Sequence, residues 1–127
     1  MKTLIFSILG LFLMTSMNRD MPAYAIYNSK GKATDFEKLV KEAAEVDVVL
    51  FGELHNSPVI HWLELELTRS LHQIKGNRLI LAAEMFESDN ALIINEYLNG
   101  KVKDKNFEAE ARLWPNYKTD YKPLLQF

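Results

Sequence analysis

The sequence predicts an α/β fold, in which a parallel sheet with flanking helices is built on a β-α-β core. Two short segments, residues 46–51 and 79–83, are nearly unbroken in apolarity, as expected of strands covered on both faces. An amphipathic segment of crossover-helix length separates them, and such connections join parallel strands in a right-handed sense. Two parallel strands do not make a stable doubly wound sheet, so we expect the N-terminal part of a longer domain.

The N-terminus has the layout of a secretory signal peptide over residues 1–25. Lys2 precedes the apolar run 4–14, and a polar stretch then leads to the small-x-small pattern of residues 23–25. The apolar run is too short to span a bilayer stably, and the alternatives are a buried N-terminal helix or a short anchor. We therefore expect an exported protein whose folded domain comprises residues 26–127.

Composition excludes several classes of protein and of site. The chain is 48% hydrophobic and 25% charged with a net charge of −2, which is typical of a globular domain and unsuited to nucleic acid. Cysteine is absent, which excludes disulfides, thiolate metal sites, Cys-x-x-Cys-His haem attachment and a lipidated cysteine. Any metal ligands must therefore be nitrogen or oxygen donors.

The first elements follow from turn and capping signals. Residues 26–32 predict a short extended segment that ends in a turn, because Asn-Ser-Lys-Gly is turn chemistry. Thr34 or Asp35 can cap a first helix. The apolar face of this helix is formed by Phe36, Leu39, Val40 and Ala43.

The crossover helix has clear start and stop signals. Gly52 ends the first strand, Asn56 or Ser57 caps the helix, and Pro58 takes a first-turn position that tolerates it. An apolar stripe at three- and four-residue spacing then continues to Gly76. Its members are Ile60, Leu63, Leu67, Leu71 and Ile74.

The last third of the chain predicts one complete helix and one that begins near the end. Ser88 or Asp89 caps the complete helix, and Gly100 supplies a left-handed end. A charged, solvated turn follows, which contains the basic residues Lys101, Lys103 and Lys105. A final segment holds Trp114-Pro115-Asn116-Tyr117 and begins a helix after the proline.

Polar residues with ligand chemistry follow both predicted strands. Glu53 and His55 follow the first strand, His61 lies on the first turn of the next helix, and Glu84 follows the second strand. Ligands bind at the carboxyl edge of open α/β sheets, so these side chains are expected to converge there. Two carboxylates with imidazoles suit Zn²⁺, Mn²⁺ or Fe²⁺, or a hydrolytic water. Haem is the other option, because a neutral imidazole or a tyrosinate can bind its iron axially.

A run of aromatic residues near the C-terminus is the second candidate feature. Trp114, Tyr117 and Tyr121 are spaced by three and four, which places them on one face of a helix. Such a stripe serves either as core or as the wall and phenolate ligand for a flat apolar group. His72 lies about three turns after His61, so we expect it at the surface.

Three motifs in order resemble those of the ChaN family of haem-binding uptake proteins, a branch of the Tiki-like and erythromycin-esterase-like superfamily. The resemblance covers roughly residues 22–127. The motifs are Val48-Val49-Leu50-Phe51-Gly52-Glu53-Leu54-His55-Asn56-Ser57-Pro58 with His61, Ala83-Glu84-Met85-Phe86-Glu87, and Arg112-Leu113-Trp114-Pro115-Asn116-Tyr117-Lys118-Thr119-Asp120-Tyr121.

The resemblance implies an exported bacterial protein of the periplasm or cell envelope that binds haem for iron uptake. It implies a homodimer formed through haem, an outer-membrane uptake receptor as partner, and a binding protein rather than an enzyme. The iron ligands implied are Tyr121, Tyr117 and His55. The wider cofactor-binding set is Glu53, His55, His61, Glu84, Trp114, Tyr117 and Tyr121.

Tiki-like relatives imply a different function on the same scaffold. They resemble metal-dependent proteases that use a Gly-x-x-His motif with acidic residues, and Gly52, Glu53, His55 and Glu84 match that pattern. The alternative is therefore a hydrolase with a divalent metal ion as cofactor. The chain also departs from the lipoprotein members of the ChaN family, because it lacks a lipobox cysteine.

Overall fold

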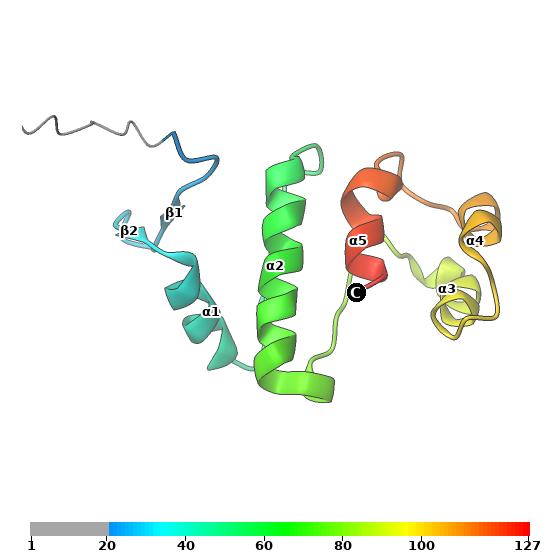
Figure 1. The fold of residues 1–127 in the computed structure, drawn as a ribbon, viewed down its shortest axis with the longest axis horizontal. Helices are drawn as coiled ribbons and strands as arrows, with labels where there is room; N and C mark the ends of the chain where they lie inside the picture. The colour runs from blue at the N-terminus through cyan, green and yellow to red at the C-terminus, as the bar shows by residue number, and fades with distance from the viewer. Residues whose placement is uncertain (1–20) are drawn as a thin grey trace, which may run out of the picture.

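The computed structural model describes residues 21–127, and residues 1–20, which hold most of the predicted signal peptide, lie outside the described part. Within the described part, the sheet has two strands that pair antiparallel, β1 (Ile26–Tyr27) and β2 (Ala33–Thr34). The helices stand in one row, in the order α1, α2, α5 and then the pair α3 and α4 (Figure 1). The predicted parallel sheet with a β-α-β core is therefore wrong.

The N-terminal hairpin and α1 (Phe36–Ala44) form as local sequence signals predict. The Asn28 side chain accepts hydrogen bonds from the backbone N–H groups of Lys30 and Lys32, both at 3.0 Å, which closes the turn. The Asp35 carboxylate accepts from the Lys38 backbone N–H at 2.7 Å and caps the helix. The predicted cap and helix are confirmed.

The long helix α2 (Pro58–Lys75) is the central element of the row. It begins after Ser57 and ends at Gly76, which has a positive φ of 57° and leads into the single turn η1 (Gly76–Arg78). Leu67 and Leu71 are buried against Ala44 at the end of α1. This cluster joins α1 to α2, and it also receives the partly buried side chains Phe36, Val40, Ala43, Phe51 and Leu79.

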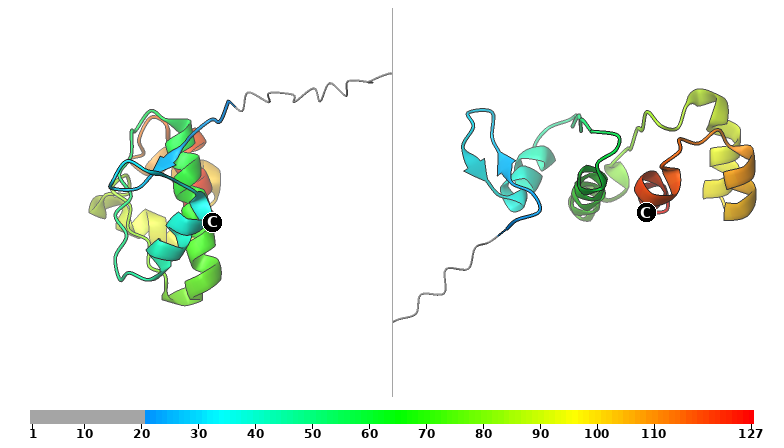
Figure 2. Two further views of the ribbon diagram at one scale, coloured as in Figure 1. Left: turned by 90° about the vertical axis from the view of Figure 1, so that its left-hand side faces the viewer. Right: turned by 90° about the horizontal axis from the view of Figure 1, so that it is seen from above.

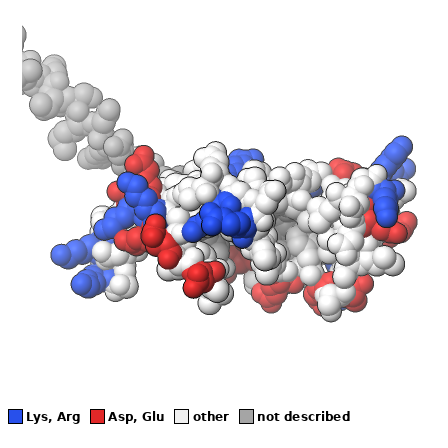
Figure 3. Space-filling model, turned by 90° about the horizontal axis from the view of Figure 1, so that it is seen from below, with Lys and Arg blue, Asp and Glu red and all other residues white. Residues whose placement is uncertain are grey.

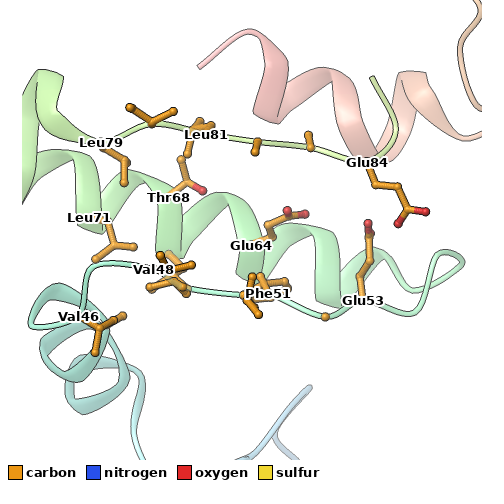
Figure 4. A pocket seen from close by; sticks show the side chains of 18 of the residues that line it. Val46, Val48, Phe51, Glu53, Glu64, Thr68, Leu71, Leu79, Leu81 and Glu84 are labelled. Carbon is orange, nitrogen blue, oxygen red and sulfur yellow. The ribbon is translucent and has the colours of Figure 1, made fainter. Parts of the chain in front are cut away.

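The two predicted strands are extended but unpaired. Residues 46–51 and 79–83 run along α2 on opposite sides of a groove of about 960 Å³, with Leu67, Thr68 and Leu71 among its lining residues (Figure 4). No backbone hydrogen bond of the described residues joins the two segments. Leu50 and Ile80 are 92% and 88% exposed. Apolar β-rich composition thus produced extended backbone, whereas a strand also needs a hydrogen-bonded neighbour that composition cannot supply.

Seen from above, the extended connections lie along one side of the row of helices (Figure 2). None of the helices within residues 21–127 combines the length and apolar character that crossing a bilayer requires. On the face drawn in Figure 3, Lys and Arg as well as Asp and Glu side chains gather at both ends, and a further basic cluster lies near the middle.

The C-terminal part is built from short helices around an aromatic core. The single turn η2 (Ser88–Asn90) leads into α3 (Ala91–Leu98), and Gly100 with φ 70° ends this unit as predicted. Helix α4 (Asp104–Glu110) occupies much of the segment predicted to be a charged turn. Its Phe107 is 0% exposed and stacks on the ring of Tyr97, with ring centroids 4.3 Å apart. The charged residues around Phe107 predicted a turn, whereas the burial of this one aromatic side chain accounts for the helix.

The chain then forms the π-helical turn η3 (Tyr117–Tyr121) and the short helix α5 (Lys122–Leu125). Tyr117 and Tyr121 are buried together with Met85 and Phe107. A π-helical turn differs in pitch from an α-helix, so the predicted single aromatic face does not form with α-helical geometry.

Lys122 joins α5 to α4 by ion pairs. Its ammonium lies 2.8 Å from carboxylate oxygens of both Asp104 and Glu108. Hydrogen bonds from Lys122 are the largest cause that lowers the pKa of Asp104 and of Glu108, and the two carboxylates in turn raise the pKa of Lys122. The folded state therefore favours the charged form of all three groups.

We expect Lys122→Met to lower the midpoint of thermal unfolding at neutral pH. Carboxylates whose pKa is lowered by folding stabilise the fold above their unfolded pKa, and this contribution disappears as the pH falls through their folded pKa. The difference from the unsubstituted chain should therefore be largest between about pH 5 and pH 10 and should shrink toward pH 3.

The matched control is Lys105→Met on α4, because Lys105 makes no ion pair within residues 21–127. Circular dichroism melts of the three chains across this pH range measure the effect. A difference between Lys122→Met and the unsubstituted chain that stays constant down to pH 3 would contradict the ion-pair explanation.

Candidate functional site

Three parts of the chain meet at the N-terminal end of α2 and form the candidate site. The loop after Gly52 carries Glu53 and His55, the first turn of α2 carries His61, and the turn η3 closes over them. Asn116 joins two of these parts, because its side-chain N–H group donates to the His55 backbone oxygen at 2.7 Å. Residues separated by more than sixty positions are thereby held side by side.

His61 is the buried centre of the site, with 2% of its side chain exposed. Its Nδ1 lies 2.8 Å from Glu53 Oε2, and the Tyr121 hydroxyl donates a hydrogen bond to the same oxygen at 3.3 Å. The rings of His61 and Tyr121 meet edge to face with centroids 4.7 Å apart. An imidazole, a carboxylate and a phenol thus form one contiguous polar cluster inside an aromatic wall.

The other imidazole nitrogen of His61 also faces acceptors. Nε2 lies 3.3 Å from the His55 backbone oxygen, which only accepts, so Nε2 donates in the tautomer of neutral His61 that makes this hydrogen bond. Asp120 adds a carboxylate oxygen 3.6 Å from Nε2, and Asn116 donates to that carboxylate at 2.7 Å. In this tautomer the Nδ1 lone pair of neutral His61 faces Glu53.

Glu64 lies one turn after His61 on α2, and its carboxylate completes a group of three. Ligand atoms of Glu53, His61 and Glu64 all lie within 4.8 Å of one another. Burial, followed by the nearby charge of Glu53, raises the pKa of Glu64. The side chains of Glu53 and Glu64 project into one end of the groove, and that of Glu84 faces them from the opposite wall (Figure 4).

Aromatic side chains surround the polar cluster. Trp114 contacts His55 on one side, with centroids 5.0 Å apart, and Tyr121 on the other, with centroids 5.7 Å apart, both edge to face. The His55 side chain is 55% exposed and also lines the groove. His55 is thus the imidazole of the site that solvent reaches.

Tyr117 lies away from the histidines. It packs against Phe107 and Phe86, at centroid distances of 5.9 and 6.3 Å, and its buried hydroxyl has no hydrogen-bond partner within residues 21–127. Burial raises the pKa of Tyr117 to about 12. The phenol of Tyr121 also has a raised pKa, first through burial, but it contacts the polar cluster.

The structure therefore brings together five of the seven residues singled out from the sequence. These are Glu53, His55, His61, Trp114 and Tyr121. Glu84 is exposed on the far wall of the groove, and Tyr117 is part of the core. His72 is exposed, as predicted.

Sequence reasoning missed three participants, Glu64, Asn116 and Asp120. Glu64 follows His61 by three positions and so shares its helix face, which was a usable signal. Asn116 and Asp120 lie in the same motif as the aromatic residues, but their role depends on contacts with His55 and His61 that no local pattern indicates.

Together these features define a helical scaffold with an exposed imidazole, a buried imidazole–carboxylate–phenol cluster and an apolar groove. Residues 39–127 match the model of the family described as haem-binding uptake, Tiki superfamily, ChaN, so the chain belongs to this family. The resemblance stated from the three motifs is confirmed. The chain matches no curated protein and no solved structure.

We expect Asn116→Asp to destabilise the chain by about 1–3 kcal/mol, because the substituted side chain no longer donates to His55 and repels Asp120. The matched control is Asn95→Asp on the exposed face of α3, for which we expect a change within about 0.5 kcal/mol. Urea denaturation at pH 7 measures both. Equal stability of the two variants would show that the Asn116 bridge does not hold the site together.

Proposed function

We propose that the protein is exported to the periplasm or cell envelope of a bacterium, where it binds haem for iron uptake. Membership of a family described as haem-binding uptake supports this function. The observation that carries it is His55, an accessible imidazole at the mouth of an apolar groove. Both features suit haem, because its iron can be held by a neutral imidazole and its macrocycle favours apolar contacts.

The surroundings of His55 fit a haem ligand. Trp114 braces the ring from one side, which limits its rotation. Leu54 is 67% exposed beside it, and the groove continues along the aliphatic segment 46–51. Imidazole binds iron through a ring nitrogen, and the His55 side chain is 55% exposed beside the groove, so solvent and an iron-containing ligand can reach its ring.

Of the two candidate tyrosines, Tyr121 is the better second ligand. Its hydroxyl is already hydrogen-bonded to Glu53, a carboxylate that can take the phenol proton when iron binds. Tyr121 is 1% exposed, so coordination of its oxygen to haem iron requires the residues that cover it to move. Tyr117 is enclosed by aromatic rings instead and serves the core.

Haem bound in this open groove would leave part of its apolar macrocycle exposed to solvent. A second copy of the chain can cover that surface, which makes a homodimer through haem the expected assembly. An outer-membrane uptake receptor is the further partner that iron uptake requires.

Haem titration into the full chain, followed by the Soret absorbance, tests the function. We expect saturable binding with a shifted Soret band, and at least tenfold weaker binding in His55→Ala, which corresponds to about 1.4 kcal/mol or more. The control is His72→Ala, because His72 also contacts one aromatic ring edge to face but lies on an exposed part of α2. Unchanged haem affinity in His55→Ala would overturn the assignment of this ligand.

Tyr121→Phe and Tyr117→Phe separate the two phenols. We expect the Soret band of haem bound to Tyr121→Phe to differ from that of haem bound to the unsubstituted chain. Haem bound to Tyr117→Phe should give the same spectrum as the unsubstituted chain, because only Tyr121 contacts the histidine cluster. The reverse result would assign the ligand role to Tyr117. Absence of any Soret shift in the unsubstituted chain would contradict haem binding itself.

A further inference from the structure

Three side chains that the haem proposal does not use as iron ligands converge behind His55. Glu53 comes from the loop after Gly52. His61 and Glu64 are three positions apart and lie on one face of α2. Each offers one ligand atom, and these atoms lie within 4.8 Å of one another. Two carboxylates and one imidazole therefore meet in a space the size of a coordination sphere.

The contact between His61 and Glu53 is not a hydrogen bond. Nδ1 of His61 lies 2.8 Å from Glu53 Oε2, but it has no hydrogen-bond partner within residues 21–127. The His61 side chain is more than nine-tenths buried. In the tautomer of neutral His61 that donates through Nε2 to the His55 backbone oxygen, the lone pair is on Nδ1. A lone pair and a carboxylate oxygen at this separation repel each other unless a proton or a metal ion lies between them.

The surroundings of His61 also match those of a metal ligand. A ligating histidine usually donates its second ring N–H to a backbone carbonyl or a carboxylate, which fixes the ring and raises its basicity. His61 Nε2 faces both kinds of acceptor, the His55 oxygen at 3.3 Å and Asp120 at 3.6 Å. Asn116 holds both acceptors in place through hydrogen bonds of 2.7 Å.

We propose that Glu53, His61 and Glu64 bind a divalent transition-metal ion. Two carboxylates balance the charge of the ion, and a mixed carboxylate and imidazole set suits Zn²⁺, Mn²⁺ or Fe²⁺. Glu53 and Glu64 project into the groove, which provides the entry path and leaves coordination positions for water (Figure 4). The ion would also join the loop after Gly52 to α2. This site does not depend on the proposed haem function, because its ligands are different.

Isothermal titration of Zn²⁺ and of Mn²⁺ into the chelator-treated full chain tests the site. We expect one ion per chain for at least one of the two metals, together with a higher midpoint of thermal unfolding, because a ligand that binds only the folded state stabilises it. Glu53→Gln and Glu64→Gln should each weaken binding at least tenfold. They keep the size of the side chain and remove one anionic ligand.

Two controls make the result specific. Glu66→Gln lies on the same helix, but Glu66 pairs with Arg69 at 2.7 Å outside the site, so metal affinity should be unchanged. His72→Ala removes an exposed imidazole and should also leave the affinity unchanged.

Equal metal affinity in Glu64→Gln and the unsubstituted chain would overturn the proposal, as would absence of binding and of thermal stabilisation by both ions. The haem titration of Glu64→Gln provides a separate readout. If Glu64→Gln retains haem binding but binds the metal more weakly, the result supports two distinct sites. If the unsubstituted chain does not bind haem, the haem proposal fails, and the metal titration alone decides the metal proposal.

Discussion

The burial of His61 is the constraint on which the arrangement of the site depends. A buried polar group without polar neighbours costs about 1–3 kcal/mol. The polar groups around His61 come from two distant parts of the chain, the loop with Glu53 and His55 and the turn with Asn116 and Asp120. Both parts must therefore dock on the start of α2, and the aromatic residues between them are positioned as a consequence.

The burial of His61 also gives the two neighbouring histidines different roles. His55 is turned outward and braced by Trp114, so it can meet a large flat ligand from the groove. His61 is turned inward with two carboxylates near its free nitrogen, so it suits a small cation. Glu53 lies between them, with its carboxylate oxygens 3.7 Å from His55 Nδ1 and 2.8 Å from His61 Nδ1.

The groove is defined by apolar surface that stays exposed to solvent. Its two walls are extended segments with exposed aliphatic side chains, and α2 supplies most of the helical surface behind them. The buried residues form two separate clusters, one that joins α1 to α2 and one around Phe107. Apolar surface left open beside an imidazole is the feature that makes this side of the molecule suitable for a hydrophobic ligand.

The sequence by itself determined several of the local elements and the family. The cap at Asp35, the extent of α2 (Pro58–Lys75) and the end at Gly100 all depend on residues a few positions apart, and the family follows from motifs in order along the chain. Only the tertiary structure decided which segments meet. It left the two apolar segments unpaired, assigned Tyr117 to the core and Tyr121 to the site, and brought Glu64 and Asn116 into contact with the histidines. Pairing and convergence depend on partners far away in the chain, which neither periodicity nor composition specifies.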